Sequence, residues 1–180
     1  MNAPLPPLVV MGVSGSGKST MGSLLGLRLD MPFFDGDDFH PAANKQKMGA
    51  GKPLTDVDRE PWLGTLGELL AGKADGVTTV PPIVACSALK RRYRDLLRSA
   101  APDVVFIHLT GSAGTIGARM EARAHEFMPR TLLESQFAAL EELDEDEAHL
   151  LADITEPPEL LVERLATELQ AVSAKTVRTA

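Results

Sequence analysis

Cysteine is nearly absent from this 180-residue chain, which contains only Cys86. A single cysteine excludes an intrachain disulfide and a metal site built from several thiolates, and we expect Cys86 to be a small buried residue. No apolar run approaches the roughly 20 residues that a membrane-spanning helix needs. Residues 1–7 also lack the basic start and long apolar core of a signal peptide. We therefore expect a cytoplasmic protein with no membrane partner.

Positive charge is also scarce, since 18 lysines and arginines face 25 aspartates and glutamates and leave a net charge of −7. This balance does not favour a nucleic-acid-binding surface. Any phosphate must therefore be bound locally, by backbone amides and a few cations. The densest acidic stretch, residues 141–147, is predicted to be a solvated turn and helix end.

One glycine-rich stretch carries a specific pattern. Residues 12–19 read G-V-S-G-S-G-K-S and match the phosphate-binding loop pattern G-x-x-x-x-G-K-[S/T] at every position. Glycines let the backbone turn its N–H groups inward, and the helix that follows adds its positive end. Lys18 should reach the outer phosphates and the Ser19 hydroxyl should ligate Mg²⁺. We predict that a nucleoside triphosphate is bound by Gly12, Val13, Ser14, Gly15, Ser16, Gly17, Lys18, Ser19 and Thr20.

Short apolar segments alternate with helical patterns along the chain. The expected strands are residues 7–11, 32–35, 82–86, 103–109 and 150–154; the expected helices are 18–29, 41–49, 57–72, 88–99, 112–122, 131–140 and 157–172. Such alternation is typical of βαβ units and a parallel sheet with helices on both faces. We predict a single α/β domain over residues 1–180, a three-layer P-loop NTPase fold with a five-stranded parallel sheet. Ligands bind beyond the carboxyl ends of such strands, so distant motifs should meet at one edge.

Acidic residues follow the second expected strand, in the stretch D-G-D-D-F-H-P at 35–41. A carboxylate at this edge can orient Mg²⁺-bound water or accept a proton from an attacking hydroxyl. Alternatively, Asp37 or Asp38 caps the helix that Pro41 opens. We favour capping for Asp38 and a functional role for Asp37.

The chain resembles the gluconate kinases (gluconokinases), which belong to the shikimate-kinase-like group of P-loop kinases. Besides the glycine-rich loop and the acidic stretch, the resemblance rests on N-K-x-K-M-x-x-G-x-P-L-T-D at 44–56, D-R-x-P-W-L at 58–63, C-S-A-L-K-R-x-Y-R-D-x-L-R at 86–98 and F-M-P-x-x-L-L-x-S-Q-F-x-x-L-E at 127–141. It covers nearly the whole chain. It implies ATP-dependent phosphorylation of D-gluconate at its 6-hydroxyl with Mg²⁺, and a homodimer. It also implies a substrate-covering segment at about 40–63 and a small helical lid at about 112–130.

The resemblance assigns roles to the residues after strands two and three. Asp37 becomes the candidate general base, and Asp35 lies nearer the metal. Many NTPases carry an acid after strand three to hold magnesium-bound water, and this chain has none there. The Ser87 hydroxyl would take that role. The predicted metal set is therefore Ser19, Asp35 and Ser87.

Cationic residues would bind the sugar acid. Arg59 resembles the arginine that binds substrate carboxylate in shikimate kinase, and a guanidinium fork suits a carboxylate. The alternative for Arg59 is a surface ion pair with Asp56 or Glu60. For His40 the alternative is a helix-start residue bonded to backbone. The predicted substrate ligands are Asp37, His40, Arg59, Lys90 and Arg94.

Residues 116–123 resemble the lid helix. Arg119 and Arg123 share one face of it, and both would neutralise charge on the transferring phosphoryl group and help to exclude water. The alternative is a solvated surface on which Arg119 pairs with Glu121 or Glu126. With Lys18 and Asp37, the two arginines complete the predicted catalytic set.

Two other functions stay open at this stage. One is a kinase for shikimate or another small hydroxy acid, although shikimate kinases normally carry three glycines where this chain has Cys86-Ser87-Ala88. The other is a nucleotide-dependent switch. A guanine-reading N-K-x-D would indicate a switch, but residues 44–47 lack the aspartate and do not follow a strand.

Overall fold

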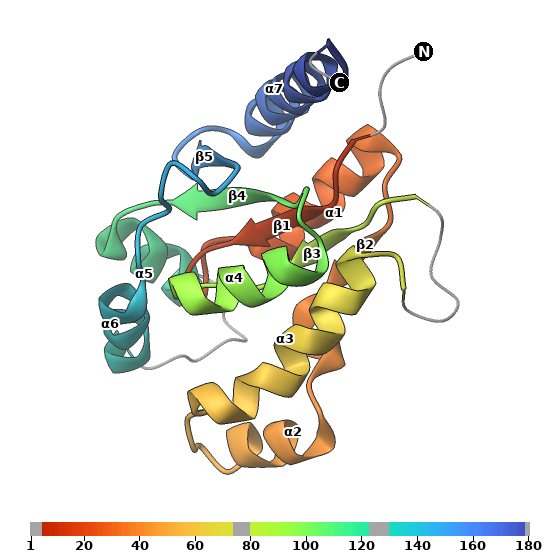
Figure 1. Ribbon diagram of the computed structural model, residues 1–180. Coiled ribbons are helices and arrows are strands. Elements are labelled where there is room, and N and C mark those ends of the chain that lie inside the picture. Colours follow the sequence, from red (N-terminus) through yellow and green to blue (C-terminus); the bar gives the residue numbers. More distant parts are fainter. Residues whose placement is uncertain (1–4, 74–79, 123–129, 179–180) are drawn as a thin grey trace.

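The computed structural model describes residues 5–73, 80–122 and 130–178 (Figure 1). Helices and strands alternate along these residues much as the sequence predicts. The elements are β1 (Leu8–Met11), α1 (Lys18–Leu29), β2 (Phe33–Asp35), the 3-10 helix η1 (Gly36–Phe39), α2 (Ala42–Gly49), α3 (Asp56–Leu70), β3 (Ile83–Ala85), α4 (Arg91–Ala100), β4 (Val105–Thr110), α5 (Ala113–Ala122), α6 (Arg130–Ala139), β5 (His149–Asp153) and α7 (Pro158–Arg178).

The five strands form one parallel sheet in the order β2-β3-β1-β4-β5. Residues at the carboxyl ends of the three adjacent strands lie in register: Asp35 pairs with Ala85, which pairs with Val10. The loops that follow these strands therefore leave the sheet at one edge. The prediction of a three-layer α/β fold with a five-stranded parallel sheet is confirmed.

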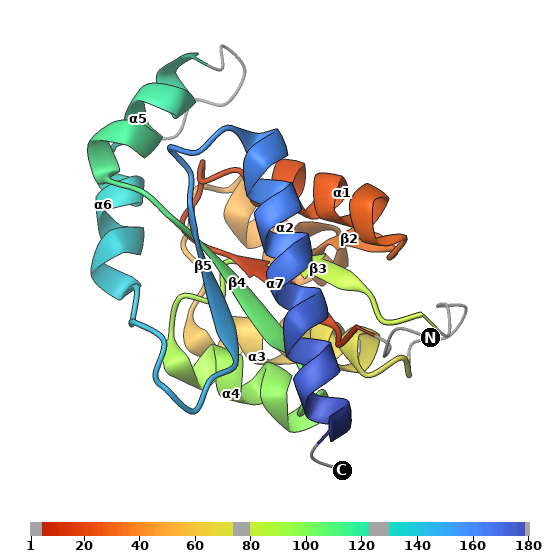
Figure 2. The same ribbon diagram turned by 90° about the horizontal axis from the view of Figure 1, so that it is seen from above.

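Two hydrophobic cores lie on opposite faces of the sheet. Successive residues of a strand point to opposite faces; accordingly Val10 belongs to the core under α1 and α7, and Val9 to the core under α3 and α4. Figures 1 and 2 show these two helix pairs on opposite sides of the sheet. Trp62 and Cys86 are 5% and 2% exposed and lie in the second core, which confirms the predicted burial of Cys86.

The remaining helices lie at the periphery. Figure 1 shows α2 beside the first turns of α3, and α5 together with α6 near the carboxyl ends of β1 and β4. Among the helices of residues 5–73, 80–122 and 130–178, none combines the length and apolar character needed to cross a membrane.

Candidate active site

The glycine-rich loop connects β1 to α1 and turns through residues with positive φ. Gly15 and Gly17 have φ of 75° and 98°, a conformation that costs glycine little. Gly17 begins α1 without a side-chain cap, which suits a helix whose first N–H groups are to bind phosphate. A Cβ on Gly15 would lie 2.4 Å from Met120 Cγ, so α5 packs directly on the loop.

The predicted metal ligands from the loop and from β2 come together. Ser19 Oγ donates to Asp35 Oδ2 at 2.6 Å, across the edge of the sheet. Ser87 lies at the same edge, where its carbonyl accepts from the Gly12 N–H at 3.3 Å. Mg²⁺ prefers oxygen ligands and takes few from the protein, with phosphate and water completing its shell. The hydroxyl and carboxylate oxygens present here fit that ion.

Asp37 follows β2 in η1, and Asp35 fixes its backbone. The Asp35 carboxylate accepts from the Asp37 N–H at 3.1 Å and caps η1. Partial desolvation and the nearby Asp35 charge raise the pKa of Asp37; its side chain is 85% exposed, so water limits this effect. The N-cap of α2 is Pro41, which makes no side-chain cap, and Asp38 contacts α2 through its backbone carbonyl, which accepts from Lys45 Nζ at 3.0 Å; the capping interpretation of Asp38 is wrong.

His40 faces Asp37 from a buried position. Its side chain is 6% exposed, with Nε2 3.8 Å from Asp37 Oδ1, and it stacks on Trp62 with ring centroids 4.1 Å apart. Nδ1 lies 3.4 Å from the Asn44 amide nitrogen. Burial lowers the pKa of His40 and outweighs the nearby Asp37 carboxylate, which raises it, while the positive charge of Arg59 lowers it further. The imidazole is therefore mainly neutral at pH 7, and its side chain does not take the backbone-bonded arrangement considered as the alternative.

Two predicted substrate cations flank one aromatic ring. The Arg59 guanidinium carbon lies 5.8 Å, and Lys90 Nζ 5.6 Å, from the centroid of Tyr93. Lys90 also pairs with Asp56 at 3.1 Å. Contacts of this kind position cations on an aromatic face. The ring therefore holds two positive groups near each other on α3 and at the start of α4.

The alternative surface ion pair of Arg59 is not formed. Asp56 and Glu60 both pair with Arg92, at 2.7 and 3.0 Å. Within the described residues, Arg59 makes no ion pair and donates instead to the carbonyl of Leu54.

Of the two predicted lid arginines, the structure describes Arg119. Arg119 is exposed and donates to the carbonyl of Ile154, beyond the end of β5. Arg123 lies outside the described residues.

Comparison with known proteins agrees with this arrangement. The shikimate kinase family model matches residues 14–156. The thermosensitive gluconokinase of Escherichia coli K12 is 46% identical over 156 residues, and the match covers 82% of each chain. The gluconokinase of Gluconobacter oxydans 621H is 41% identical, with 91% of each chain covered. A gluconokinase structure from Sinorhizobium meliloti 1021 superposes with a TM-score of 0.88 at 39% identity, covering 100% of this chain and 99% of the other.

This chain belongs to the shikimate kinase family, in its gluconokinase group. It is therefore a P-loop kinase that transfers phosphate to an alcohol group of a small molecule.

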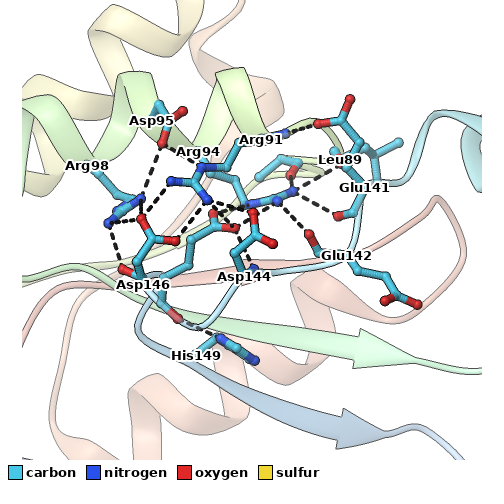
Figure 3. A network of polar contacts seen from close by, with 12 residues as sticks. Leu89, Arg91, Arg94, Asp95, Arg98, Glu141, Glu142, Asp144, Asp146 and His149 are labelled. Atoms are coloured by element: carbon cyan, nitrogen blue, oxygen red, sulfur yellow. Dashed lines mark hydrogen bonds and ion pairs between the residues drawn. The ribbon is translucent and has the colours of Figure 1, made fainter.

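The structure of this family member corrects the role of Arg94. Its side chain is fully buried and holds the Glu147 carboxylate with two of its nitrogens, at 2.6 and 3.0 Å (Figure 3). The remaining N–H groups donate to the backbone carbonyls of Ala88, Leu89, Glu141 and Glu142. A guanidinium has five N–H donors, and all are engaged here. The prediction that Arg94 binds substrate is wrong; it supports the kinase fold instead.

The acidic stretch at 141–147 is also more than a solvated turn. Glu147 is 1% exposed, and hydrogen bonds from Arg94 and from backbone outweigh its desolvation and lower its pKa. Asp144 and Asp146 each pair with Arg91 at 2.7 Å (Figure 3). The stretch therefore attaches the segment before β5 to the first turn of α4.

We expect Glu147→Gln to destabilise the kinase strongly, because it leaves the Arg94 charge buried without its partner. The expected loss in the free energy of unfolding is about 3 to 5 kcal/mol, measured by urea denaturation. The matched control is Glu145→Gln, an exposed acid of the same stretch, for which we expect a change within about 0.5 kcal/mol. Equal stability of the two variants would contradict the structural role of the Arg94–Glu147 pair.

Proposed function

We propose that this chain transfers the γ-phosphoryl group of ATP to the 6-hydroxyl of D-gluconate. The observation that carries the proposal is the 39–46% identity with named gluconokinases over most of the chain, at a site that brings the loop, Asp35 and Asp37 together. Positioning and charge neutralisation supply most of the rate in such transfers.

The nucleotide side of the site uses the loop and Lys18. In the structure Lys18 Nζ donates to the carbonyl of Val13 at 3.1 Å. When ATP binds, the ammonium reaches the outer phosphates and stabilises charge on the transferring group. Ser19 and Asp35 would hold Mg²⁺, with Ser87 contributing through its hydroxyl. The bound ion would neutralise phosphate charge.

On the acceptor side, Asp37 accepts the proton of the attacking hydroxyl. Its raised pKa brings it closer to the range useful for a general base than that of an ordinary aspartate. His40 is mainly neutral, so it can accept a hydrogen bond from the substrate or donate one to it. It does not compete with Arg59 and Lys90 for the substrate carboxylate, as a cation would. The stack on Trp62 fixes its ring.

The acceptor carboxylate is bound by Arg59 and Lys90 beside Tyr93. Arg59 is not neutralised by an acid within the described residues, and Lys90 can exchange Asp56 for the substrate anion. Arg119 and Arg123, in the lid segment 112–130, then neutralise the transferring phosphoryl group as the lid closes over the triphosphate, while the segment 40–63 covers the acceptor.

A substrate panel tests the proposal. ADP release is measured with ATP and Mg²⁺ in the presence of D-gluconate, its epimeric sugar acids, shikimate, or no acceptor. We expect fast release with gluconate and little with the others or alone. Preference for shikimate would favour the other small-acid kinase, and acceptor-independent hydrolysis would favour a nucleotide-dependent switch.

A further inference from the structure

Gln136 of α6 contacts the phosphate-binding loop at two atoms of one residue. Its Oε1 accepts from the Ser14 backbone N–H at 2.6 Å, and its Nε2 donates to Ser14 Oγ at 2.9 Å. These residues are 122 positions apart in the chain. The orientation of the amide is settled by chemistry, because a backbone N–H can only donate and must face the oxygen.

We propose that Gln136 is a positioning residue for ATP, which sets the conformation of the first half of the loop and the direction of the Ser14 hydroxyl proton. Gln136 fixes the peptide plane of Ser14, within a loop whose backbone N–H groups bind phosphate. A hydroxyl that accepts from Nε2 keeps its own proton to donate. That proton is then available to a phosphate oxygen. The proposal rests on the nucleotide part of the proposed function and not on gluconate.

The helix that carries Gln136 is anchored just beyond its last residue. Glu141 N–H donates to the carbonyl of Leu89 at 2.8 Å, while Arg94 donates to the carbonyls of Glu141 and Glu142 at 3.2 and 3.1 Å. This anchor is fixed to the β3–α4 segment (Figure 3), and the side chain of Arg94 within it is wholly buried. Gln136 therefore approaches Ser14 from a support whose own hydrogen bonds are made to the β3–α4 segment and not to Ser14.

The chemistry at position 136 calls for a neutral amide. A glutamate would still accept from the Ser14 N–H, but it could not donate to Oγ, and its charge would face the incoming triphosphate. A leucine has a similar shape and makes neither bond. The two substitutions therefore separate lost hydrogen bonding from added negative charge.

The test measures nucleotide binding without any acceptor. Isothermal titration gives the Kd for ADP and for a non-hydrolysable ATP analogue, in the parent and in Gln136→Leu, Gln136→Glu and the control Glu134→Gln, an exposed residue of the same helix. We expect Gln136→Leu to raise the analogue Kd about tenfold, from the loss of two hydrogen bonds. Gln136→Glu should raise it further, and Glu134→Gln should leave it within about twofold of the parent.

Three further readouts distinguish positioning from a merely structural role. In steady-state assays, Gln136→Leu should raise the KM for ATP and leave the KM for gluconate within about twofold of the parent. Its thermal midpoint without nucleotide should match that of the control. In a double-mutant cycle, Ser14→Ala should reduce the effect of Gln136→Leu, because the hydroxyl bond is already lost.

The inference is overturned if Gln136→Leu binds the analogue as tightly as the parent. It is also overturned if affinity for both substrates and the thermal midpoint fall together, since that pattern reports general loss of structure. Acceptor selectivity has no bearing on these binding measurements. A failure of the gluconate proposal would therefore show in the substrate panel and not here.

Discussion

Replacing Lys18 with alanine is expected to lower kcat by about 100- to 1,000-fold, the usual effect of removing one group that stabilises charge in the transition state. Lys18 opens α1, and its ammonium lies against the loop that is to hold the phosphates. No other lysine or arginine belongs to residues 12–20. Charge developing on the transferred group would therefore lose the one cation that the loop supplies. Steady-state kinetics with saturating ATP and gluconate measure the change.

Two controls separate the loss of the Lys18 ammonium from a general effect of removing a lysine and from unfolding. Lys73→Ala removes an exposed lysine beyond the end of α3 and should leave kcat unchanged. The thermal midpoint of Lys18→Ala should stay close to that of the parent, because the Lys18 side chain belongs to neither hydrophobic core and its hydrogen bond to the Val13 carbonyl lies within its own loop. A purified, folded Lys18→Ala protein with near-normal turnover would remove the role assigned to Lys18.

Asp37→Asn is expected to lower kcat by about 100- to 10,000-fold, because an amide cannot accept the hydroxyl proton. ATP binding should be retained, since Asp35 and Ser19 provide the metal oxygens. The parent should also lose activity as pH falls through the pKa of Asp37, because only the carboxylate is active. The pKa of Asp37 is raised above its ordinary value of 3.8. The fall in activity at acid pH should therefore be centred above pH 3.8. The residual activity of Asp37→Asn should not show this decrease at acid pH.

The neighbouring acid offers a matched control. Asp38→Asn changes an exposed carboxylate one position along η1 and should leave kcat within about twofold of the parent. Calorimetric titration with nucleotide and Mg²⁺ decides what Asp37 does. Lost nucleotide binding in Asp37→Asn would argue for a metal role in place of the general base.

The fold was predictable because its signals are local. The glycine-rich loop lies between an apolar strand and a helix with apolar residues at helical spacing, and the same alternation of strand and helix recurs to the end of the chain. The approach of Ser19 to Asp35 followed from topology, since parallel strands in one sheet end at the same edge. The motifs, together with the predicted parallel sheet, were therefore enough to place the loop and the acids after β2 near each other.

The role of Arg94 was not predictable from helical spacing. Lys90 and Arg94 are one turn apart, but Lys90 precedes α4 and its side chain meets Asp56, whereas Arg94 points into the interior toward Glu147. Its partner Glu147 is 53 residues away in the sequence, and no local sequence pattern predicts such a pair. The available signal was the presence of two stretches of unlike charge, the acids at 141–147 and the arginines at 91–98. This suggests that the two stretches pair, but it does not show which residues are buried.

Gln136 was missed for a similar reason. It lay inside the block S-Q-F that supported the resemblance, yet nothing in a helical sequence shows that one polar side chain will reach a distant loop. A contact between polar side chains far apart in the sequence depends on where two elements pack, and packing is decided by the whole chain.

The most direct test of the account is the position of the phosphate in the product. The enzyme is incubated with ATP, Mg²⁺ and D-gluconate, and the product is examined by phosphorus NMR with proton coupling. We predict a phosphomonoester whose signal is split by the two protons of C6, and its loss with Lys18→Ala. A signal coupled to one proton, as from a secondary hydroxyl, or inorganic phosphate alone, would contradict the proposed transfer.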